Sequence, residues 1–557
     1  MNTKNLTHIE YISGDSAHTL LKDQQFLQDW RILYDRCLHA TVLQDQSFVR
    51  TWYETYRSIW QPVIIYSRNS EGCFNGLWLL AFDPLHKTLV HAGTNQAEYH
   101  VWLAVPGKDI EFLSDAWNEL KLRLSFTQLR FHYLPSITLA NTLKSVPGIK
   151  SNCFVENVNR CLFKIDEDTV KSIFSKNSNK SRINRLKRLG QIEFRQISAI
   201  EEFEQVFGEI ISLYDFRQGA INNSLPFQNN PLKRRFHFNL FNAEPDKLIF
   251  TITYLNNRPI AGFWGQVSSK IVHLGMVMHS PSLSRHSPGK IHLMQLSEHL
   301  QKKGFRMIDM TPGGDFWKQR YANTNDEVAS VTVYRSSIRQ KLAVIQNTWK
   351  QLSKRYLTKL GVNSTWLRLT LKNNLNDIHP ANLFRTLKNK AYSDKEFRMY
   401  AFEGNNTIVD GEWLDKRVQC NSLNDFLAFK PTDSHLTIGA FLSNANDMFE
   451  NEASSYSICI NNSLAICGWM IVDRKEIQLG KVLHSITLPS GSVVLVNFYS
   501  QSNFSDKDIN QAIIKHMVSE AFALEGTKKV YIFVRARNKF LQETVESMDF
   551  QYQISYL

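Results

Sequence analysis

The feature that most constrains the fold of this chain is an order of predicted strands and helices that recurs along the sequence. In residues 160–335, strands and helices precede three successive strands, LIFTITYL, PIAGFWGQVS and KIVHLGMVM, and a turn, a helix and the strand FRMIDM follow. Short polar turns between the three strands predict an antiparallel meander, and the intervening helices predict layers of helix against sheet. The residues before 160 and after 392 also contain successive predicted strands together with helices. We therefore predict an α/β fold with mixed sheets, in three units.

The boundaries of these units account for all 557 residues. The first unit is predicted over 1–158, the second over 159–335 and the third over 393–557. Between the second and third units, 336–392 has a helical pattern without strands, which predicts a basic helical linker. Apolar residues make up 43% of the chain and charged residues 21%, and this globular composition excludes disordered and fibrous classes.

The positive charge of the chain is concentrated in two segments. The net charge is +13, and 336–393 holds eleven basic residues and one acid, whereas 171–188 holds seven basic residues and no acid. The remainder is nearly neutral, which argues against a protein that binds nucleic acid over its whole surface. One interpretation of each segment is a helix whose basic face is exposed to solvent. The alternatives are contact with an anionic membrane surface through 336–393 and contact with tRNA phosphates through 171–188.

Cysteines, histidines and apolar runs bear on compartment and metal binding. The seven cysteines include no CxxC pair, and the 17 histidines fall in no HExxH pattern, so we predict neither a disulfide framework nor a metal site. The N-terminal residues lack the apolar core of a signal peptide. No apolar run approaches the about 18 residues of a membrane-spanning helix. These features predict a cytoplasmic protein.

The loop before one predicted helix has the composition of a phosphate-binding turn. Ser287, Pro288, Gly289 and Lys290 follow the meander and open a helix. The first turn of a helix has unpaired N–H groups and the positive end of the helix dipole. A glycine lets a phosphate approach the backbone, and serine or lysine adds a donor. The other interpretation is an ordinary strand-to-helix turn with proline at the first helical position.

A second loop, at the end of the strand FRMIDM, combines glycine, acidic, aromatic and basic residues. The strand ends near Asp309, and Gly313, Asp315, Trp317 and Lys318 follow. Such residues at the C-terminal end of a strand are typical of a site loop. The chain contains no Walker A, GxGxxG or GxSxG pattern, so these nucleotide-binding and hydrolase classes are not indicated.

Together the two loops resemble those of the GNAT acyltransferases, in the CelD-like branch that is akin to the FemAB-type proteins. In that pattern an SPG loop opens a helix, and a later strand that ends in Asp is followed by glycine, an aromatic residue and lysine. TVLQDQSF with Trp52, and AGTNQAEY at 92–99, resemble parts of the first half of such proteins. The resemblance covers roughly 25–335 and implies two GNAT-like folds in tandem, with the active cleft between them.

The C-terminal unit also resembles a GNAT fold. Asn538, with the residues up to Phe550, resembles a late helix and strand of that family. Asp549 stands where the family usually has glycine, and the loop at 500–505 contains no glycine. A loop without glycine hinders close approach of a pyrophosphate to the backbone. The resemblance therefore implies a third GNAT-like unit that is degenerate, with retained activity as the alternative.

The resemblance implies acyl transfer from a thioester donor, acyl-CoA or acyl carrier protein, to an amine or hydroxyl acceptor, with an envelope or exopolysaccharide precursor as one acceptor class. Such a reaction needs a base, hydrogen-bond donors for the carbonyl oxygen and groups that neutralise the donor phosphates. The matching residues are Lys318, Asp315 and His286 as catalytic groups, Ser287, Gly289 and Lys290 at the donor, and Tyr99, His100, Arg217 and Trp317 at the acceptor. The alternative for each is an ordinary surface, turn or packing residue.

Two other functions stay open. One is aminoacyl transfer of the FemAB type, in which 171–188 would bind charged tRNA. The other is a non-catalytic scaffold of degenerate GNAT units. The Ser-Pro-Gly loop departs from the usual GNAT phosphate loop, which leaves the donor open. Strong salt dependence of RNA binding would support the first alternative, and failure to bind any acyl donor would support the second.

Overall fold

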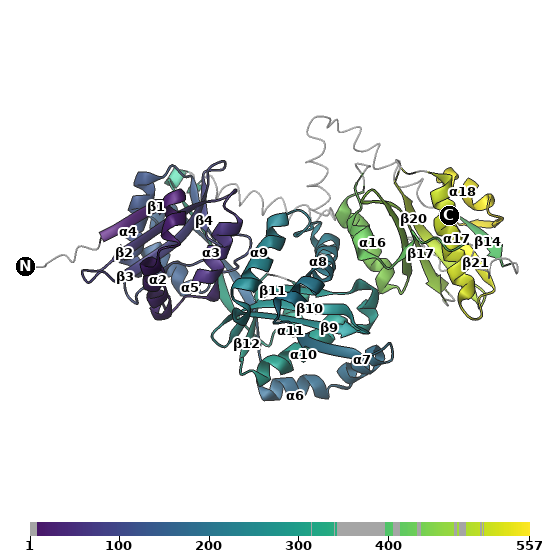
Figure 1. Cartoon of the computed structure of the whole chain (residues 1–557), viewed down its shortest axis with the longest axis horizontal. Helices are drawn as coiled ribbons and strands as arrows, with labels where there is room; N and C mark the ends of the chain where they lie inside the picture. The colour runs from purple at the N-terminus through teal and green to yellow at the C-terminus, as the bar shows by residue number, and fades with distance from the viewer. Residues whose placement is uncertain are drawn as a thin grey trace, which may run out of the picture.

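The computed structural model of the chain describes residues 8–313, 315–338, 340–341, 396–404, 413–431, 436–472, 476–477, 486–501, 504 and 506–556. Figure 1 shows the first unit in purple at one end, the second in teal in the middle, and the third in green and yellow at the other end. Mixed sheets packed with helices confirm the predicted α/β class. The linker predicted at 336–392, and the membrane contact predicted through 336–393, lie outside the described residues except for 336–338 and 340–341.

The first unit alternates strands and helices. Its elements are β1 (His8–Ser13), α1 (Asp15–Leu20), α2 (Gln24–Arg36), α3 (Gln46–Thr55), β2 (Gln61–Arg68), β3 (Phe74–Asp83), β4 (Thr88–His91), β5 (Leu103–Ala104), α4 (Asp109–Arg123), β6 (Gln128–Leu134), α5 (Ile137–Ser145) and β7 (Cys153–Lys164). Phe48, Val49 and Trp52 form the buried face of α3 at helical spacing. Asp45 caps this helix by accepting a hydrogen bond from the backbone N–H of Ser47.

The second unit has the meander that the sequence predicts. Its elements are α6 (Glu167–Ser175), α7 (Asn177–Lys187), β8 (Ile192–Gln196), α8 (Ile200–Asn222), α9 (Pro231–Ala243), β9 (Leu248–Leu255), β10 (Arg258–Ser268), β11 (Ile271–His279), the 3₁₀ helix η4 (Pro281–His286), α10 (Pro288–Lys302), β12 (Met307–Pro312), α11 (Phe316–Tyr321) and β13 (Thr324–Tyr334). Antiparallel pairing joins β9 to β10 and β10 to β11. The turns between these strands are too short for the crossover that parallel strands need, so neighbouring strands run antiparallel.

The first two units share one thirteen-stranded sheet. Its order is β1-β2-β3-β4-β6-β13-β7-β12-β11-β10-β9-β8, with β5 paired to β3. β7 and β13 are each the last strand of their own unit, and they pair with each other from Cys153 to Leu162 and from Thr324 to Val333. Each strand therefore lies inside the sheet of the other unit. β7 runs across the boundary predicted at residue 158, so the two units are joined by continuous strand pairing.

The third unit repeats this order in a sheet of its own. Its elements are β14 (Phe397–Glu403), β15 (Gln419–Cys420), α15 (Leu423–Leu427), α16 (Ile438–Glu450), β16 (Ser454–Ile460), β17 (Ser463–Val472), β18 (Glu476–Ile477), β19 (Ile486–Thr487), β20 (Ser492–Ser500), α17 (Lys507–Ala523), β21 (Lys529–Arg535), α18 (Lys539–Glu546) and β22 (Gln551–Tyr556). The order β15-β16-β17-β20-β21-β14-β22 matches β8-β9-β10-β11-β12-β7-β13 strand for strand. The third unit is therefore a further copy of one fold.

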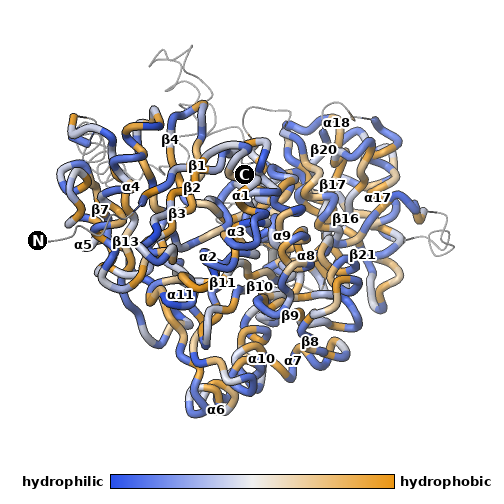
Figure 2. The backbone as a smooth tube through the Cα atoms, turned by 60° about the vertical axis from the view of Figure 1, so that its left-hand side comes forward, coloured by the Kyte–Doolittle hydropathy of each residue, from blue (hydrophilic) through white to orange (hydrophobic). Residues whose placement is uncertain are grey.

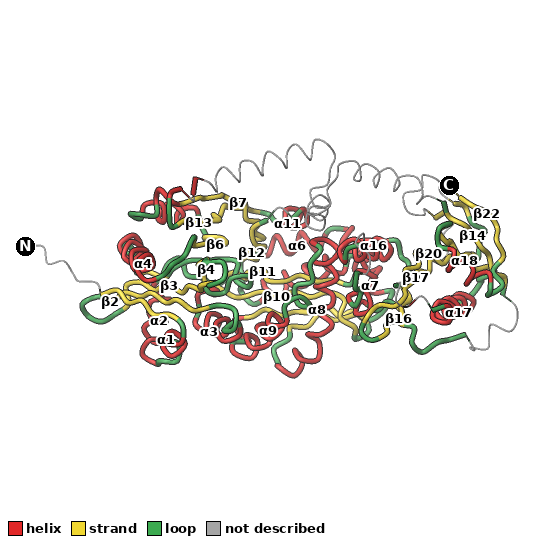
Figure 3. The backbone as a smooth tube through the Cα atoms, turned by 90° about the horizontal axis from the view of Figure 1, so that it is seen from above, coloured by secondary structure: helices red, strands yellow, loops and turns green. Residues whose placement is uncertain are grey.

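Helices cover both faces of the large sheet. Figure 3 shows α1, α2, α3, α9 and α8 along one face, and α4, α6 and α11 along the other. One apolar core runs beneath the first set of helices and joins the two units, with Trp30, Trp52 and Phe203 among its buried residues. In Figure 2 the apolar colour follows the inner strands, whereas the loops are mostly hydrophilic. Burial of these faces is the main force that holds the layers together.

The third unit packs against the second through α16. This helix contacts α8 and η4. The backbone N–H of Gly439 donates to Asn223 Oδ1 at 2.7 Å, and the rings of Phe216 and Phe449 lie 6.0 Å apart. The third unit therefore touches the loop that precedes α10.

Candidate active site

The site begins where two parallel strands separate. β11 and β12 pair only from Ile271 to His273 and from Met307 to Asp309. Beyond that point β11 continues to His279, and the pairing of β12 with β7 is irregular between Asp309 and Pro312. The gap between diverging strands exposes backbone groups and gives access to the interior of the sheet.

The equivalent gap in the first unit is closed by its own chain. β4 and β6 are parallel over Thr88 to Val90. Tyr99 then bridges to Tyr133, and the backbone N–H of His100 donates to the Tyr133 carbonyl at 2.8 Å. This added pairing occupies the place that stays open between β11 and β12.

A cavity of about 470 Å³ lies at the gap, on the side of α6, α10 and α11. Its walls include Leu274, Val277, Met310 and Trp317, and its charged lining residues are Asp168, Lys176, Lys290 and Arg320. Desolvation, followed by the charges of Arg182, Arg320 and Lys176, lowers the pKa of Lys290. An apolar slot with a cluster of cations at its edge fits a ligand with an apolar arm and a phosphorylated end.

The helix at this cavity differs from its counterparts in the other units. The helices that follow the meander are α4, α10 and α17, and only α10 has no acidic residue in its first turn. α4 carries Asp109 and Glu111 there, whereas α17 has the cap Asp506 and Asp508. Carboxylates compete with an anion for the N–H groups and dipole of a helix N-terminus. Among the three units, the second is therefore the one suited to bind phosphate.

The loop before α10 contains buried polar atoms without partners. In the described part of the chain, no hydrogen bond satisfies Arg185 Nε, Ser284 Oγ or His286 Nδ1. η4, which carries Ser284 and His286, contacts α7, which carries Arg185. Unsatisfied buried donors and acceptors are costly, and Arg185, Ser284 and His286 do not line the cavity beside α10.

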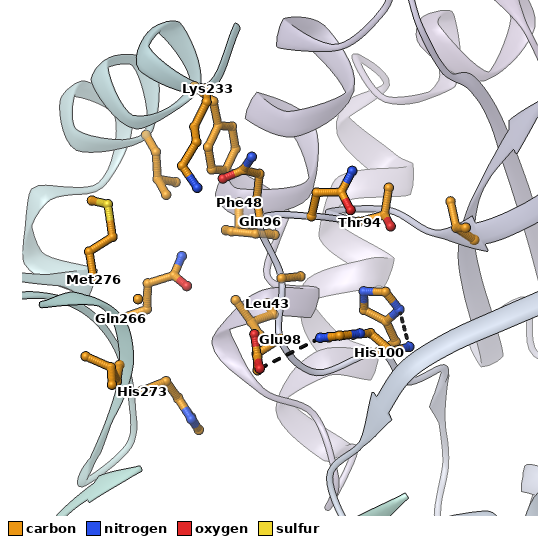
Figure 4. Close-up of a pocket in the computed structure, with 18 of the residues that line it drawn as sticks. Leu43, Phe48, Thr94, Gln96, Glu98, His100, Lys233, Gln266, His273 and Met276 are labelled. Atoms are coloured by element: carbon orange, nitrogen blue, oxygen red, sulfur yellow. Dashed lines mark hydrogen bonds and ion pairs between the residues drawn. The ribbon is translucent and has the colours of Figure 1, made fainter. Parts of the chain in front are cut away.

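A second cavity, of about 350 Å³, lies between the first and second units. Figure 4 shows Thr94, Gln96, Glu98 and His100 of the first unit facing Lys233, Gln266, His273 and Met276 of the second. Leu274 lines both cavities. The two cavities therefore share a wall at Leu274 of β11, beside the point where β11 and β12 separate.

A buried carboxylate organises this junction. Asp309 is 1% exposed and accepts hydrogen bonds from Tyr99 Oη at 2.6 Å and from the Thr311 backbone N–H at 2.8 Å. His273 Nδ1 lies 3.0 Å and Arg160 Nη1 3.4 Å from its Oδ2. Burial alone would raise the pKa of Asp309, but these contacts, led by His273, hold it below its usual value. The ionised carboxylate fixes His273 Nδ1 as a donor.

The other nitrogen of His273 is free to act. His273 is 7% exposed and lines the cavity between the units, and its Nε2 has no hydrogen-bond partner in the described structure. A histidine whose Nδ1–H is held by a carboxylate keeps its lone pair on Nε2, and in His273 this nitrogen is buried. The arrangement can accept a proton from a molecule in the cavity.

Glu98 adds an acidic group to the same cavity. Burial raises the pKa of Glu98 to about 7, with Lys318 opposing the shift and Asp309 adding to it. Its Oε1 lies 3.8 Å from His132 Nε2. A carboxyl group with this pKa is ionised only in part at neutral pH, and it can bind or release a proton there.

The predicted site loop packs at the gap. Lys318 is 7% exposed, and its Nζ donates to Thr311 Oγ1 at 3.0 Å and lies 3.5 Å from Asp315. Thr311 has φ of 65°, a strained value for a β-branched residue. Arg217 Nη1 donates to the Val277 carbonyl at 2.8 Å, and the Arg217 guanidinium lies 5.4 Å from the Trp317 ring. Gly314 lies outside the described residues.

The structure brings several predicted site residues together and leaves others apart. Trp317 and Lys290 line the cavity beside α10, and His100 lines the cavity between the units. Tyr99, Arg217, Asp315 and Lys318 line neither cavity; Tyr99 bonds to Asp309, Arg217 to the Val277 carbonyl, and Lys318 lies 3.5 Å from Asp315. His286 lines neither cavity, and its neighbour Arg285 pairs with Glu452 of the third unit. Ser287 is the αL residue before α10. The backbone of Gly289 packs closely against His279. A Cβ at position 289 would lie 3.1 Å from the His279 ring.

The sequence analysis missed His273 and Glu98. His273 is the polar residue within the apolar run KIVHLGMVM, and Glu98 stands between Ala97 and Tyr99 in a loop that was matched only as a family segment. An isolated histidine inside a buried strand was the available signal. The contact of Asp309 with Tyr99 joins residues 210 positions apart, and no local pattern predicts such a contact.

Comparison with known proteins agrees with this architecture. Residues 175–319, from α7 into α11, match the family model of the acetyltransferase (GNAT) domain. The same strand order occurs in the units on either side. The second unit therefore contains the region that matches the GNAT acetyltransferase domain, and the third unit repeats its strand order. No curated protein matches the sequence.

Solved structures with similar folds have low sequence identity. FemX is 10% identical, with a TM-score of 0.39, 56% of this chain covered and 97% of FemX. A tandem GNAT protein from the clavulanic acid biosynthesis pathway is 9% identical, with a TM-score of 0.36 and coverage of 59% and 99%. The C-terminal domain of a putative lysylphosphatidylglycerol synthetase from Agrobacterium fabrum is 8% identical, with a TM-score of 0.37 and coverage of 58% and 95%. Such values indicate no substrate for this chain.

No helix within the described ranges has the length and apolarity to cross a bilayer. Nor do His, Cys, Asp and Glu side chains gather there in groups of three or more that could hold a metal ion.

Proposed function

We propose that the chain transfers an acyl group from a thioester donor, acyl-CoA or acyl carrier protein, to an amine or hydroxyl acceptor. The observation that carries the proposal is the open gap between β11 and β12, beside which two separate cavities share the wall residue Leu274. The donor lies in the cavity beside α10, and the acceptor lies in the cavity between the units. The reacting groups meet beside His273.

The second unit binds the donor. Lys290 and Arg320, with Lys176 beside them, neutralise the donor phosphates, and the apolar walls hold the acyl-bearing arm. The free edge of β11 beyond His273 offers backbone groups to the amides of that arm, once Arg217 releases the Val277 carbonyl. The third unit, with Asp506 and Asp508 at the equivalent helix, braces the second unit and does not bind donor.

His273 acts as the base and Asp309 as the residue that positions it. The acceptor nitrogen or oxygen forms a bond to the acyl carbon and gives its proton to His273 Nε2. The carbon–sulfur bond breaks, and the departing thiolate takes this proton from His273, so His273 is neutral again and the thiol and the acylated acceptor leave. General base catalysis of this kind contributes about 10²–10⁴-fold in rate. Lys318, seated below the gap, stabilises the charge that develops on the carbonyl oxygen.

The nature of the acceptor as an envelope or exopolysaccharide precursor rests on the family resemblance alone. Transfer from aminoacyl-tRNA is the competing function, and one observation favours it. Lys180, Lys187 and Arg188 are exposed on and beside α7, next to the donor cavity. RNA binding whose affinity falls steeply with salt would support tRNA as the donor carrier, whereas binding that is insensitive to salt would exclude it.

Calorimetric titration tests the donor site. CoA and a phosphopantetheinylated acyl carrier protein are titrated into the parent, Lys290→Glu, Arg320→Glu and Lys507→Glu. Because a charged hydrogen bond to phosphate is worth about 1.5–3 kcal/mol, each of the first two variants should weaken binding at least tenfold. Lys507→Glu alters the equivalent helix of the third unit and should change nothing. Sensitivity of Lys507→Glu alone, or no binding of either donor, would refute the proposal.

A further inference from the structure

We infer that the acceptor is a primary amine that also carries an anionic group, a carboxylate or a phosphate, with Lys233 binding the anion and Glu98 the amine. This inference rests on the proposed function, because it names the molecule that enters the acceptor cavity. Figure 4 shows Lys233 and Glu98 at opposite ends of that cavity. A cation and an anion at opposite ends match a ligand with the complementary charges.

Lys233 is placed where a cation does not stabilise the protein. It lies in the first turn of α9, with Asn230 as the cap, and the positive end of the helix dipole repels a cation there. Desolvation lowers the pKa of Lys233 to about 8, and Asp215 opposes the shift. Within the described residues no carboxylate forms an ion pair with its Nζ, and the Asp215 oxygens already accept from the backbone N–H groups of Phe227 and Gln228.

The surroundings of Lys233 hold its ammonium in the cavity without neutralising it. Its Nζ lies 5.2 Å from the Phe227 ring centre and 5.9 Å from the Tyr214 ring centre. Cation–π contact attracts a cation but leaves its charge available to an anion. His237, on the next turn of α9, has a pKa lowered to about 3 by burial and by Lys233, so it is neutral. Lys233 is therefore the cation that this end of the cavity offers to an anionic group.

Glu98 forms the other end. Its side chain is 34% exposed, and His132 at 3.8 Å is its neighbour across the cavity wall. Burial lowers the pKa of His132, and Arg130 adds to the shift, so His132 is largely neutral at pH 7 and does not cancel the charge of Glu98. His273 lines the same cavity, so an amine held at Glu98 shares the cavity with the base, and the anionic group sets its orientation.

Calorimetry with ω-aminocarboxylates from β-alanine to 6-aminohexanoate tests this inference at pH 7.5, and the corresponding aminoalkyl phosphates form a second arm. Each compound is compared with its neutral analogue, the amide or the alcohol, and with its analogue that lacks the amine. At least one zwitterion should bind tenfold or more tightly than both analogues. The arm that contains it identifies the anion as carboxylate or phosphate.

Two variants assign the ends of the cavity. Lys233→Met should abolish the preference for the anionic compound over its neutral analogue, and Glu98→Gln should abolish the preference for the amine. Arg234→Met, an exposed neighbour on α9, is the control and should keep both preferences. Equal binding of zwitterion and analogues, preferences that survive in Lys233→Met and Glu98→Gln, or no binding in either arm would overturn the inference. CoA titrated in the same instrument reports on the donor site, so a failure of the proposed function is seen separately.

Discussion

Replacement of Asp309 by alanine should destabilise the sheet shared by the first two units by a predictable amount. The substitution leaves Tyr99 Oη, His273 Nδ1 and the Thr311 N–H without their buried acceptor. An unsatisfied buried donor costs about 1–3 kcal/mol. Three such donors, each at the lower part of this range, lower the free energy of unfolding by about 4 kcal/mol. Removing one partner of a buried charged pair costs a similar amount, about 3–5 kcal/mol.

Differential scanning calorimetry measures this loss. The unfolding entropy is about 2.1 cal/mol/K per residue, and for a shared unit of about 330 residues a loss of about 4 kcal/mol corresponds to a melting temperature lower by about 6 °C. Asp326→Asn removes a partly exposed partner of Arg160 and is the control. It should cost about 0.5 kcal/mol, which is less than 1 °C. A folded Asp309→Ala variant that melts within 1 °C of the parent would refute the reasoning.

Three further predictions concern catalysis, binding and packing. Asp309→Asn presents an amide N–H to His273 Nδ1, which turns Nε2 into a donor. The rate of acyl transfer should therefore fall about 10²–10⁴-fold, while the Kd for CoA stays unchanged. Unchanged turnover would contradict the role of His273. Binding of the zwitterion that binds most tightly in the titrations above should peak between pH 7 and 8, because Glu98 loses its charge below its pKa of about 7 and Lys233 loses its charge above its pKa of about 8. Two pH units from the optimum the affinity should be about 20-fold lower. Glu98→Gln should remove the acidic limb and Lys233→Met the alkaline limb, and a flat profile in the parent would contradict both assignments. Gly439→Ala brings a Cβ within 2.5 Å of Asn223 Oδ1. It should therefore weaken the packing of the third unit against the second by about 1–3 kcal/mol of free energy and speed proteolysis between the units. Gly208→Ala on α8 is the control, because its Cβ meets no atom within 4 Å, and it should not change the rate of proteolysis.

The sequence predicts the fold well because the fold depends on local patterns. Three apolar runs separated by short polar turns predict the meander β9, β10 and β11, and the helical spacing of Phe48, Val49 and Trp52 predicts the buried face of α3. The exchange of β7 and β13 could not be predicted, because a strand in either position shows the same apolar pattern. Only the pairing of Cys153 with Val333 and its neighbours reveals that the units share one sheet.

The site could be predicted only where its chemistry lies in one loop. The loop from Asp309 to Lys318 combines glycine, charge and aromatic residues within a few positions, and Met310 and Trp317 of this loop line the cavity beside α10. Lys233 and Glu98 come from different units and face each other across a cavity. Their desolvation, which shifts both pKa values, arises from tertiary packing and has no signature in the sequence.

The most direct test of the central claim is a crystal structure of the chain with CoA bound. The account predicts the pantetheine arm between β11 and β12 and the diphosphate beside Lys290 and Arg320, with the thiol directed toward His273. CoA bound at the first turn of α4 or α17, or at a surface remote from the gap, would contradict it.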